Sequence, residues 1–135
     1  MIIESSAILA ILYRGPAFEV FLKAIVDARA CAISAASFVE VSMVIESRRG
    51  DSAIRQWDAF FRTSGISVAP VTEEQAVLAR QGYSYYGKSR HPAGLNFGDC
   101  MSYALAQVCG EELLFKGTDF AQTDIDSAGA PPVRA

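Results

Sequence analysis

The sequence predicts an α/β domain in which a mostly parallel sheet of four to five strands lies between two layers of helices. Short apolar runs alternate along the chain with longer segments of helical periodicity, and neither a repeat nor a linker separates them. Alternating strands and helices favour a parallel sheet, because right-handed crossover helices then cover both of its faces. At 135 residues, 51% of them hydrophobic, the chain suits one core and is too short for two. We therefore expect a single three-layer α/β/α domain over residues 1–135.

Turn and capping residues divide the first half of the chain into strands and helices. Gly15 and Pro16 end one helix, and Pro16 also suits the first turn of the next helix. Gly50 stops a later helix, because glycine readily takes the left-handed conformation at a helix end. These signals predict strands at residues 1–3 and 31–33 and helices at residues 6–13, 16–29, 34–49 and 51–62.

Similar signals divide the second half. Thr72 and Gln75 have the spacing of a capping box, and Asn96 can cap a further helix that Gly110 closes. Proline is tolerated in an edge strand, so residues 132–133 can add a strand at the edge of the sheet. We expect strands at residues 67–71, 112–115 and 132–133, helices at residues 72–86 and 96–110, and a loop at residues 87–95.

Composition and charge exclude several classes of protein. The net charge of −3 gives no general attraction to nucleic acid, so RNA binding would need local basic patches. The apolar run Ala7–Tyr13 is too short to span a bilayer, and Glu4 interrupts an N-terminus that lacks the features of a signal peptide. We therefore expect a cytoplasmic protein without membrane association. In a reducing compartment Cys31, Cys100 and Cys109 are expected as small core side chains, not as disulfide partners or zinc ligands.

Four acidic residues each lie next to an apolar run: Glu4, Glu40, Asp99 and Asp119. A carboxylate beside a buried segment carries a desolvation cost, and several brought together repel one another unless a cation lies between them. In open α/β sheets the functional crevice lies at the carboxyl ends of the strands, and Glu4 and Asp119 both follow predicted strands. The pattern therefore favours a shared metal site at this edge of the sheet.

Each acid also has a simpler interpretation when it is taken alone. Asp99 lies in the first turn of its helix, where a carboxylate can cap the helix and interact favourably with its dipole. Glu4 can accept backbone hydrogen bonds at the end of a strand, and Asp119 can cap a turn, as Asp124 can. Glu40 is the hardest to explain alone, because valines flank it on both sides. One common site explains all of the acids at once.

The residue types indicate which ion and which chemistry such a site would support. Carboxylate oxygens suit a hard cation such as Mg²⁺ or Mn²⁺, whereas zinc favours histidine and cysteine, and the chain has one histidine. That residue, His91, lies with Lys88 and Arg90 in a basic loop just before Asp99. These side chains either contact an RNA backbone or are simply solvated. A phosphoacceptor receiver domain is excluded, because no aspartate follows the predicted third strand.

The segments at residues 1–7, 37–46, 95–100 and 114–120 each carry one of the four acids. In order and spacing they resemble the motifs of PIN-domain ribonucleases, specifically the VapC toxins of bacterial VapBC toxin–antitoxin systems. The resemblance implies a PIN-like fold and an Mg²⁺- or Mn²⁺-dependent endoribonuclease that cleaves structured RNA, such as loops of tRNA or rRNA. It also implies a homodimer and a VapB-type antitoxin that covers the active site. Carried over by position, Glu4, Glu40, Asp99 and Asp119 would be the catalytic and metal-binding acids, with Ser6 and Asp124 as accessory residues. The RNA-binding candidates Lys88, Arg90 and His91 rest on the charge of their loop and not on this resemblance.

The chain departs from this family at one position. The family nearly always has aspartate where this chain has Glu4. Glutamate keeps the charge but moves the carboxylate outward by roughly 1.5 Å, the length of one C–C bond. Catalytic groups generally need placing within about 0.5 Å of productive geometry. The alternative to an active ribonuclease is therefore a weakened PIN-like module that dimerises and binds an antitoxin or RNA without cutting.

Overall fold

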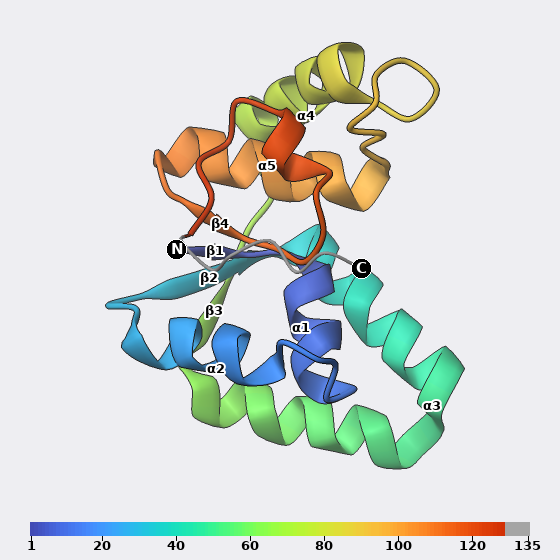
Figure 1. Ribbon diagram of the computed structural model, residues 1–135, viewed down its shortest axis with the longest axis vertical. Helices are drawn as coiled ribbons and strands as arrows, with labels where there is room; N and C mark the ends of the chain where they lie inside the picture. The colour runs from blue at the N-terminus through green and yellow to red at the C-terminus, as the bar shows by residue number, and fades with distance from the viewer. Residues whose placement is uncertain (129–135) are drawn as a thin grey trace.

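The computed structural model describes residues 1–128 and shows a parallel sheet between two layers of helices (Figure 1). The strand order is β3-β2-β1-β4, and each neighbouring pair is parallel. The elements are, in chain order, β1 (Ile2–Ile3), α1 (Ser5–Leu12), α2 (Phe18–Asp27), β2 (Cys31–Ser34), α3 (Ala35–Ser64), β3 (Ile66–Ala69), α4 (Glu73–Tyr86), α5 (Phe97–Cys109), β4 (Leu113–Leu114) and η1 (Phe120–Gln122). The predicted three-layer α/β/α class is confirmed, and the expected strand at residues 132–133 lies outside the described residues.

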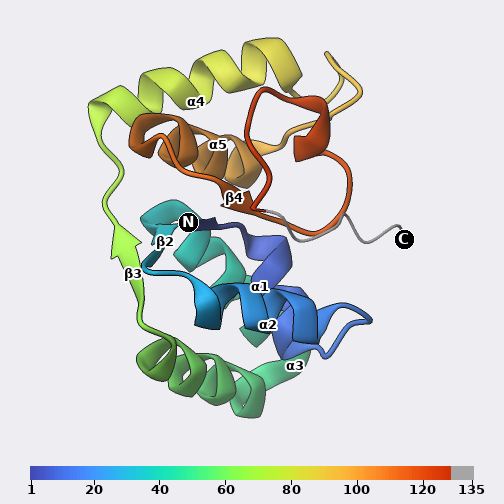
Figure 2. The same cartoon turned by 60° about the vertical axis from the view of Figure 1, so that its left-hand side comes forward.

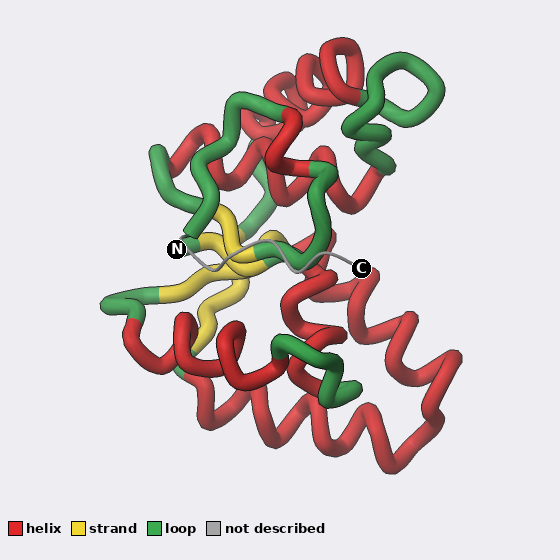
Figure 3. The backbone as a smooth tube through the Cα atoms, viewed as in Figure 1, coloured by secondary structure: helices red, strands yellow, loops and turns green. Residues whose placement is uncertain are grey.

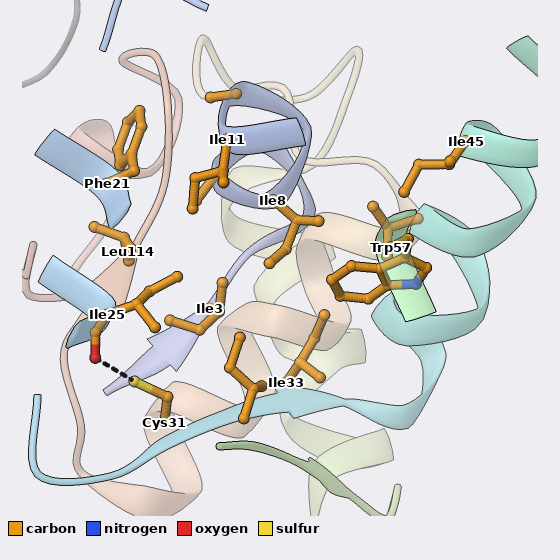
Figure 4. Packing of buried hydrophobic residues seen from close by; sticks show 14 of the residues in the cluster. Ile3, Ile8, Ile11, Phe21, Ile25, Cys31, Ile33, Ile45, Trp57 and Leu114 are labelled. Carbon is orange, nitrogen blue, oxygen red and sulfur yellow. Dashed lines mark hydrogen bonds between the residues drawn. The ribbon is translucent and has the colours of Figure 1, made fainter. Parts of the chain in front are cut away.

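The two layers of helices bury opposite faces of the same short strands (Figures 2 and 3). Ile3 and Leu114 pack into the cluster formed with α1, α2 and α3, whereas Ile2 and Leu113 pack into the cluster formed with α4 and α5. This alternation follows from the twofold side-chain period of a strand. Figure 4 shows the larger cluster, where Ile8 lies close to Trp57, which is fully buried. The two-residue strands β1 and β4 therefore connect both halves of the core.

Gly50 breaks helical geometry inside α3. Its backbone angles, φ 77° and ψ −165°, fall in a region that is essentially restricted to glycine. The second half of the helix then folds back, so that Trp57 Nε1 donates a hydrogen bond to Ser42 Oγ in the first half at 2.8 Å. The sequence correctly predicted two helical segments that meet at Gly50. The second segment continues to Ser64, two residues beyond the predicted end.

The predicted cap of α5 is complete, but that of α4 is only half formed. Asn96 caps α5, and Gly110 ends it in the left-handed conformation, as expected. Thr72 Oγ1 accepts a hydrogen bond from the backbone N–H of Gln75 at 3.2 Å, which confirms the cap of α4. The Gln75 side chain does not return this bond to Thr72, because its amide donates to Pro70 O at 3.1 Å. The capping-box prediction was therefore wrong in its second arm.

Three further details differ from the sequence-based expectation. Pro16 does not lie in the first turn of α2, because the backbone N–H of Phe18 donates to Gly15 O and closes a separate turn before the helix. β3 spans residues 66–69 and not 67–71, since its register is fixed by pairing with β2. Cys31 and Cys100 are buried as expected, but Cys109 is exposed at the last position of α5, so its assignment to the core was wrong.

The chain returns to the edge of the sheet after η1. Ser127 forms an isolated parallel bridge with Leu113, whose backbone N–H donates to Asp126 O at 3.0 Å. The described C-terminal segment thus protects the outer edge of β4. None of the helices within residues 1–128 is long and apolar enough to cross a membrane.

Candidate active site

Three of the four predicted acids come after strands of the sheet, and the fourth lies at the start of the helix that leads back to β4. Glu4 directly follows β1, and its backbone N–H donates to Leu114 O at the end of β4 at 3.0 Å. Glu40 lies in α3, which follows β2 without a loop, and Asp119 follows β4 and precedes η1. Asp99 lies in the first turn of α5. The parallel sheet therefore brings to its carboxyl edge residues that are more than a hundred positions apart in the chain.

Glu4 is held in a buried position at the start of α1. Only 4% of the residue is exposed, and its Oε2 accepts a hydrogen bond from the backbone N–H of Ser6 at 2.7 Å. Ser6 in turn accepts a hydrogen bond at Oγ from the backbone N–H of Lys116 at 2.8 Å. Ser6 thus connects Glu4 with the segment that leads to Asp119, which gives the predicted accessory residue a physical role. Glu4 caps a helix and faces the other acids at the same time.

Asp99 also combines a structural contact with a place in the site. Its backbone N–H donates to Asn96 Oδ1 at 2.9 Å, and its Oδ2 accepts from the backbone N–H of Asn96 at 3.0 Å. The capping interpretation of Asp99 is therefore correct. It does not exclude a second role, because one carboxylate offers two oxygens and about four lone-pair directions. For Asp119, by contrast, no side-chain hydrogen bond caps the turn that follows.

Gly98 allows the Glu40 carboxylate to approach the N-terminus of α5. A Cβ atom added at Gly98 would overlap both carboxylate oxygens of Glu40, so a larger residue at this position would displace the Glu40 side chain from where it lies. The glycine thus permits a close approach, and no unusual backbone angle is involved. Sequence reasoning missed this role. The only signal was a glycine in the first turn of a helix, where it has no capping function.

The carboxylates influence one another electrostatically. Burial raises the pKa of Glu4 from about 4.5 to about 7; the hydrogen bonding from Ser6 opposes this shift, and the negative charges of Asp99 and Glu40 add to it. Burial also raises the pKa of Asp99, against the hydrogen bond from Asn96, and the charges of Asp119 and Glu40 raise it further. Every one of the four acids thus acts on at least one other. This is the mutual repulsion that the sequence pattern predicted.

The acids are not arranged as a ready-made coordination sphere. Within residues 1–128, no three histidine, cysteine, aspartate or glutamate side chains are placed so that they could hold a metal ion. Backbone hydrogen bonds hold Glu4 and Asp99 in place. The donor set fits a hard cation in its chemistry, because it consists of carboxylate oxygens that are partly desolvated by burial. Binding would require these side chains to draw closer together.

The hydrogen bonds of the Asp124 side chain are to residues of α5 and not to any of the four acids. Its carboxylate accepts hydrogen bonds from Tyr103 Oη at 2.9 Å and from Gln107 Nε2 at 3.0 Å. Burial, followed by the hydrogen bond to Asp124, raises the pKa of Tyr103 to about 12. The Asp124 side chain therefore fastens the C-terminal segment to α5, and sequence reasoning missed this contact because it joins residues that are distant along the chain.

The basic loop at residues 87–95 is ordered by its own contacts. The Arg90 guanidinium lies over the Tyr83 ring, 5.9 Å from its centroid. His91 Nδ1 accepts a hydrogen bond from the backbone N–H of Ala93 at 3.0 Å, and its ring packs edge-on against Tyr86. Lys88 is exposed. The loop presents cations on the segment that leads directly into α5 and Asp99.

Comparisons with known proteins agree in one family. Residues 1–126 match the family described as PIN domain. A protein named Ribonuclease VapC from Mycolicibacterium smegmatis is 45% identical over 125 residues, which cover 93% of this chain and 97% of that protein. Ribonuclease VapC30 from Mycobacterium tuberculosis is 42% identical over 131 residues, covering 97% of this chain and all of that protein.

Two solved structures share the fold at low sequence identity. One is Mycobacterium tuberculosis VapC20, described as a sarcin-ricin loop cleaving toxin, with a TM-score of 0.73, 18% identity and coverage of 99% of this chain and 98% of that one. The other is a toxin–antitoxin complex from Klebsiella pneumoniae, with a TM-score of 0.66, 18% identity and coverage of 91% and 92%. At this identity the likeness establishes the three-dimensional arrangement alone.

The raised pKa of Glu4 predicts how stability depends on pH in the absence of metal. Because folding raises this pKa from about 4.5 to about 7, the contribution of Glu4 to stability is greatest below pH 4.5 and is lost as the pH rises through 7. The loss should approach about 3 kcal/mol. Glu4→Gln keeps an oxygen that can accept the Ser6 hydrogen bond but does not ionise. In EDTA, the free energy of unfolding of the variant, relative to that of the parent protein, should therefore rise by about this amount between pH 4.5 and 8. Urea denaturation at each pH measures it. Parallel pH profiles of the two proteins would contradict the prediction.

Proposed function

The chain belongs to the PIN-domain family, in the branch of VapC-type toxins, and on that basis we propose that it is an endoribonuclease that needs Mg²⁺ or Mn²⁺. Its substrate is structured RNA, such as a loop of tRNA or rRNA, and it acts in the cytoplasm. The proposal rests chiefly on one observation, the mutual electrostatic influence of Glu4, Glu40, Asp99 and Asp119 at the carboxyl edge of the sheet. Carboxylates that repel one another are stabilised when a cation binds between them and neutralises their charge.

The four acids would have different roles, because their surroundings differ. Glu4 and Asp99 are the most constrained, since each carboxylate is fixed by a backbone hydrogen bond, and they would form the fixed part of the ion-binding set. Asp119 is exposed and would complete that set from the outer side. A bound ion would neutralise charge on the phosphoryl oxygens and activate water for in-line attack on a phosphodiester. Glu40, held against Gly98, would accept the proton of that water.

RNA would approach over the basic loop. Lys88, Arg90 and His91 lie just before α5 in the chain, and contacts to phosphates by such side chains fix the register of a nucleic acid without reading its sequence. Because Arg90 and His91 already pack on tyrosine rings, little conformational freedom would be lost on binding. The overall charge of −3 would confine this attraction to the loop.

The protein partners would be a second copy of the chain and an antitoxin. Phe97, two residues before Asp99, is 75% exposed and lines a largely apolar hollow of about 560 Å³ between α4 and α5. Exposed apolar surface of this kind marks an interaction site. We propose that a symmetric homodimer covers this hollow, and that a VapB-type antitoxin silences the site. The names of the curated relatives, which are VapC ribonucleases 42–45% identical to this chain, support the second partner.

A rival function is a module that binds RNA or antitoxin without cutting it. It rests on Glu4, where the family has aspartate. One observation weighs against it, since the Glu4 carboxylate is buried and hydrogen-bonded at the same place where the charges of Asp99 and Glu40 raise its pKa. A nuclease assay on total RNA separates the two functions, because only the enzyme produces new RNA ends when Mg²⁺ or Mn²⁺ is added.

The first prediction for this function concerns Asp99. We expect cleavage only with Mg²⁺ or Mn²⁺, no cleavage in EDTA, and a loss of at least about 100-fold in Asp99→Asn, since even hydrogen-bond partners of metal ligands cost 10- to 100-fold when removed. The asparagine oxygen can still accept the hydrogen bond from Asn96, so the cap of α5 should survive. In EDTA the variant should melt no lower than the parent, because it removes one of the repelling charges. If Mn²⁺ raises the melting temperature of the parent and of the variant equally, and the variant still cleaves RNA, then Asp99 is only a helix cap.

The second prediction concerns Glu4. Glu4→Asp restores the shorter side chain of the family and can still accept the Ser6 hydrogen bond at the start of α1. We expect the cleavage rate with Mn²⁺ to rise by several-fold, with a similar melting temperature as the check on folding. A folded variant with lower activity would show instead that the site has adapted to the longer side chain.

A further inference from the structure

Two serines join the helices that carry Glu40 and Asp99. Ser37 in α3 and Ser102 in α5 lie with their Oγ atoms 3.0 Å apart, and each residue is 0% exposed. Sixty-five positions separate them in the chain, so the hydrogen bond between them is a purely tertiary contact. Either hydroxyl can be the donor. Buried hydroxyl groups need such partners, but an apolar pair would fill the same space without that requirement.

The register of the two helices gives this contact a direct relation to the site. Ser37 lies three residues before Glu40, and Ser102 lies three residues after Asp99. Residues three apart lie on the same face of a helix, one turn from each other. The hydrogen bond therefore joins the two turns next to those that bear the carboxylates. The two helices also meet at a second point, where the Glu40 carboxylate of α3 lies against Gly98 of α5.

We propose that the Ser37–Ser102 hydrogen bond is a positioning device that fixes α3 against α5 and so sets the separation of the Glu40 and Asp99 carboxylates. Like charges on two facing helices push the helices apart, and a directional bond of defined length resists this better than an apolar contact. The serines are positioning residues and not catalytic ones, because they act through the two acids. This inference rests on the proposed function, since it assigns the serines a role in holding the same site.

The test uses Ser37→Ala, Ser102→Ala and the double variant. Each single change leaves one buried hydroxyl without a partner and should lower the melting temperature, whereas the double change removes both hydroxyls and should recover much of it. The affinity for Mn²⁺ should not recover together with the melting temperature. We expect calorimetry with Mn²⁺ alone to give a Kd about tenfold weaker in all three variants, and kcat on RNA to fall by a similar factor with KM unchanged. The double variant should show little further loss beyond either single one, since all three lack the same bond.

Ser34→Ala is the matched control. Ser34 is also 0% exposed and lies just before α3, but among the described residues its Oγ has no hydrogen-bond partner. Its removal should leave the Mn²⁺ affinity and kcat at the parental values. A merely structural role for the serine pair predicts that the double variant regains the parental Kd together with its melting temperature, and that result would overturn the inference while leaving the proposed function intact. A folded parent that neither binds Mn²⁺ nor cleaves RNA would overturn both.

Discussion

Like charges held together at the carboxyl edge of the sheet are the constraint on which this structure depends. Burial raises the pKa of Glu4 to about 7 although Ser6 donates a hydrogen bond to it, so packing on both faces of the sheet must offset the remaining cost. The two-residue strands β1 and β4 supply this packing, since their alternate side chains enter separate clusters. The cost is the kind that a functional site carries, because the same arrangement becomes favourable once a cation is bound.

The fold was largely predictable because its signals are local. Asn96 and Gly110 act as expected in the structure, and Gly50 breaks the helix at the expected position, although its ψ of −165° is not that of a left-handed helix end. The errors arose where tertiary contacts decide. Gln75 binds Pro70 O instead of returning the capping bond to Thr72, and pairing with β2 sets the ends of β3.

The candidate site was predictable only in part. The four acids were recognisable because each lies beside an apolar run, and the resemblance to PIN-domain ribonucleases identified them together. The contacts that place them were not recognisable, because they join distant segments. Gly98 makes room for Glu40, Ser6 connects Glu4 to Lys116, and Ser102 meets Ser37. Glycine and serine are common enough that only spatial neighbours reveal such roles.

The most direct measurement is anomalous diffraction from crystals of the unmodified protein grown with Mn²⁺. The proposal predicts a manganese peak bounded by Glu4, Asp99 and Asp119, with these carboxylates drawn closer together than in the metal-free protein. The Asp99 side chain should then use one oxygen for Asn96 and the other for the ion. Ordered carboxylates without a manganese peak between them, at a Mn²⁺ concentration that saturates cleavage, would contradict the assignment of these acids as the metal site.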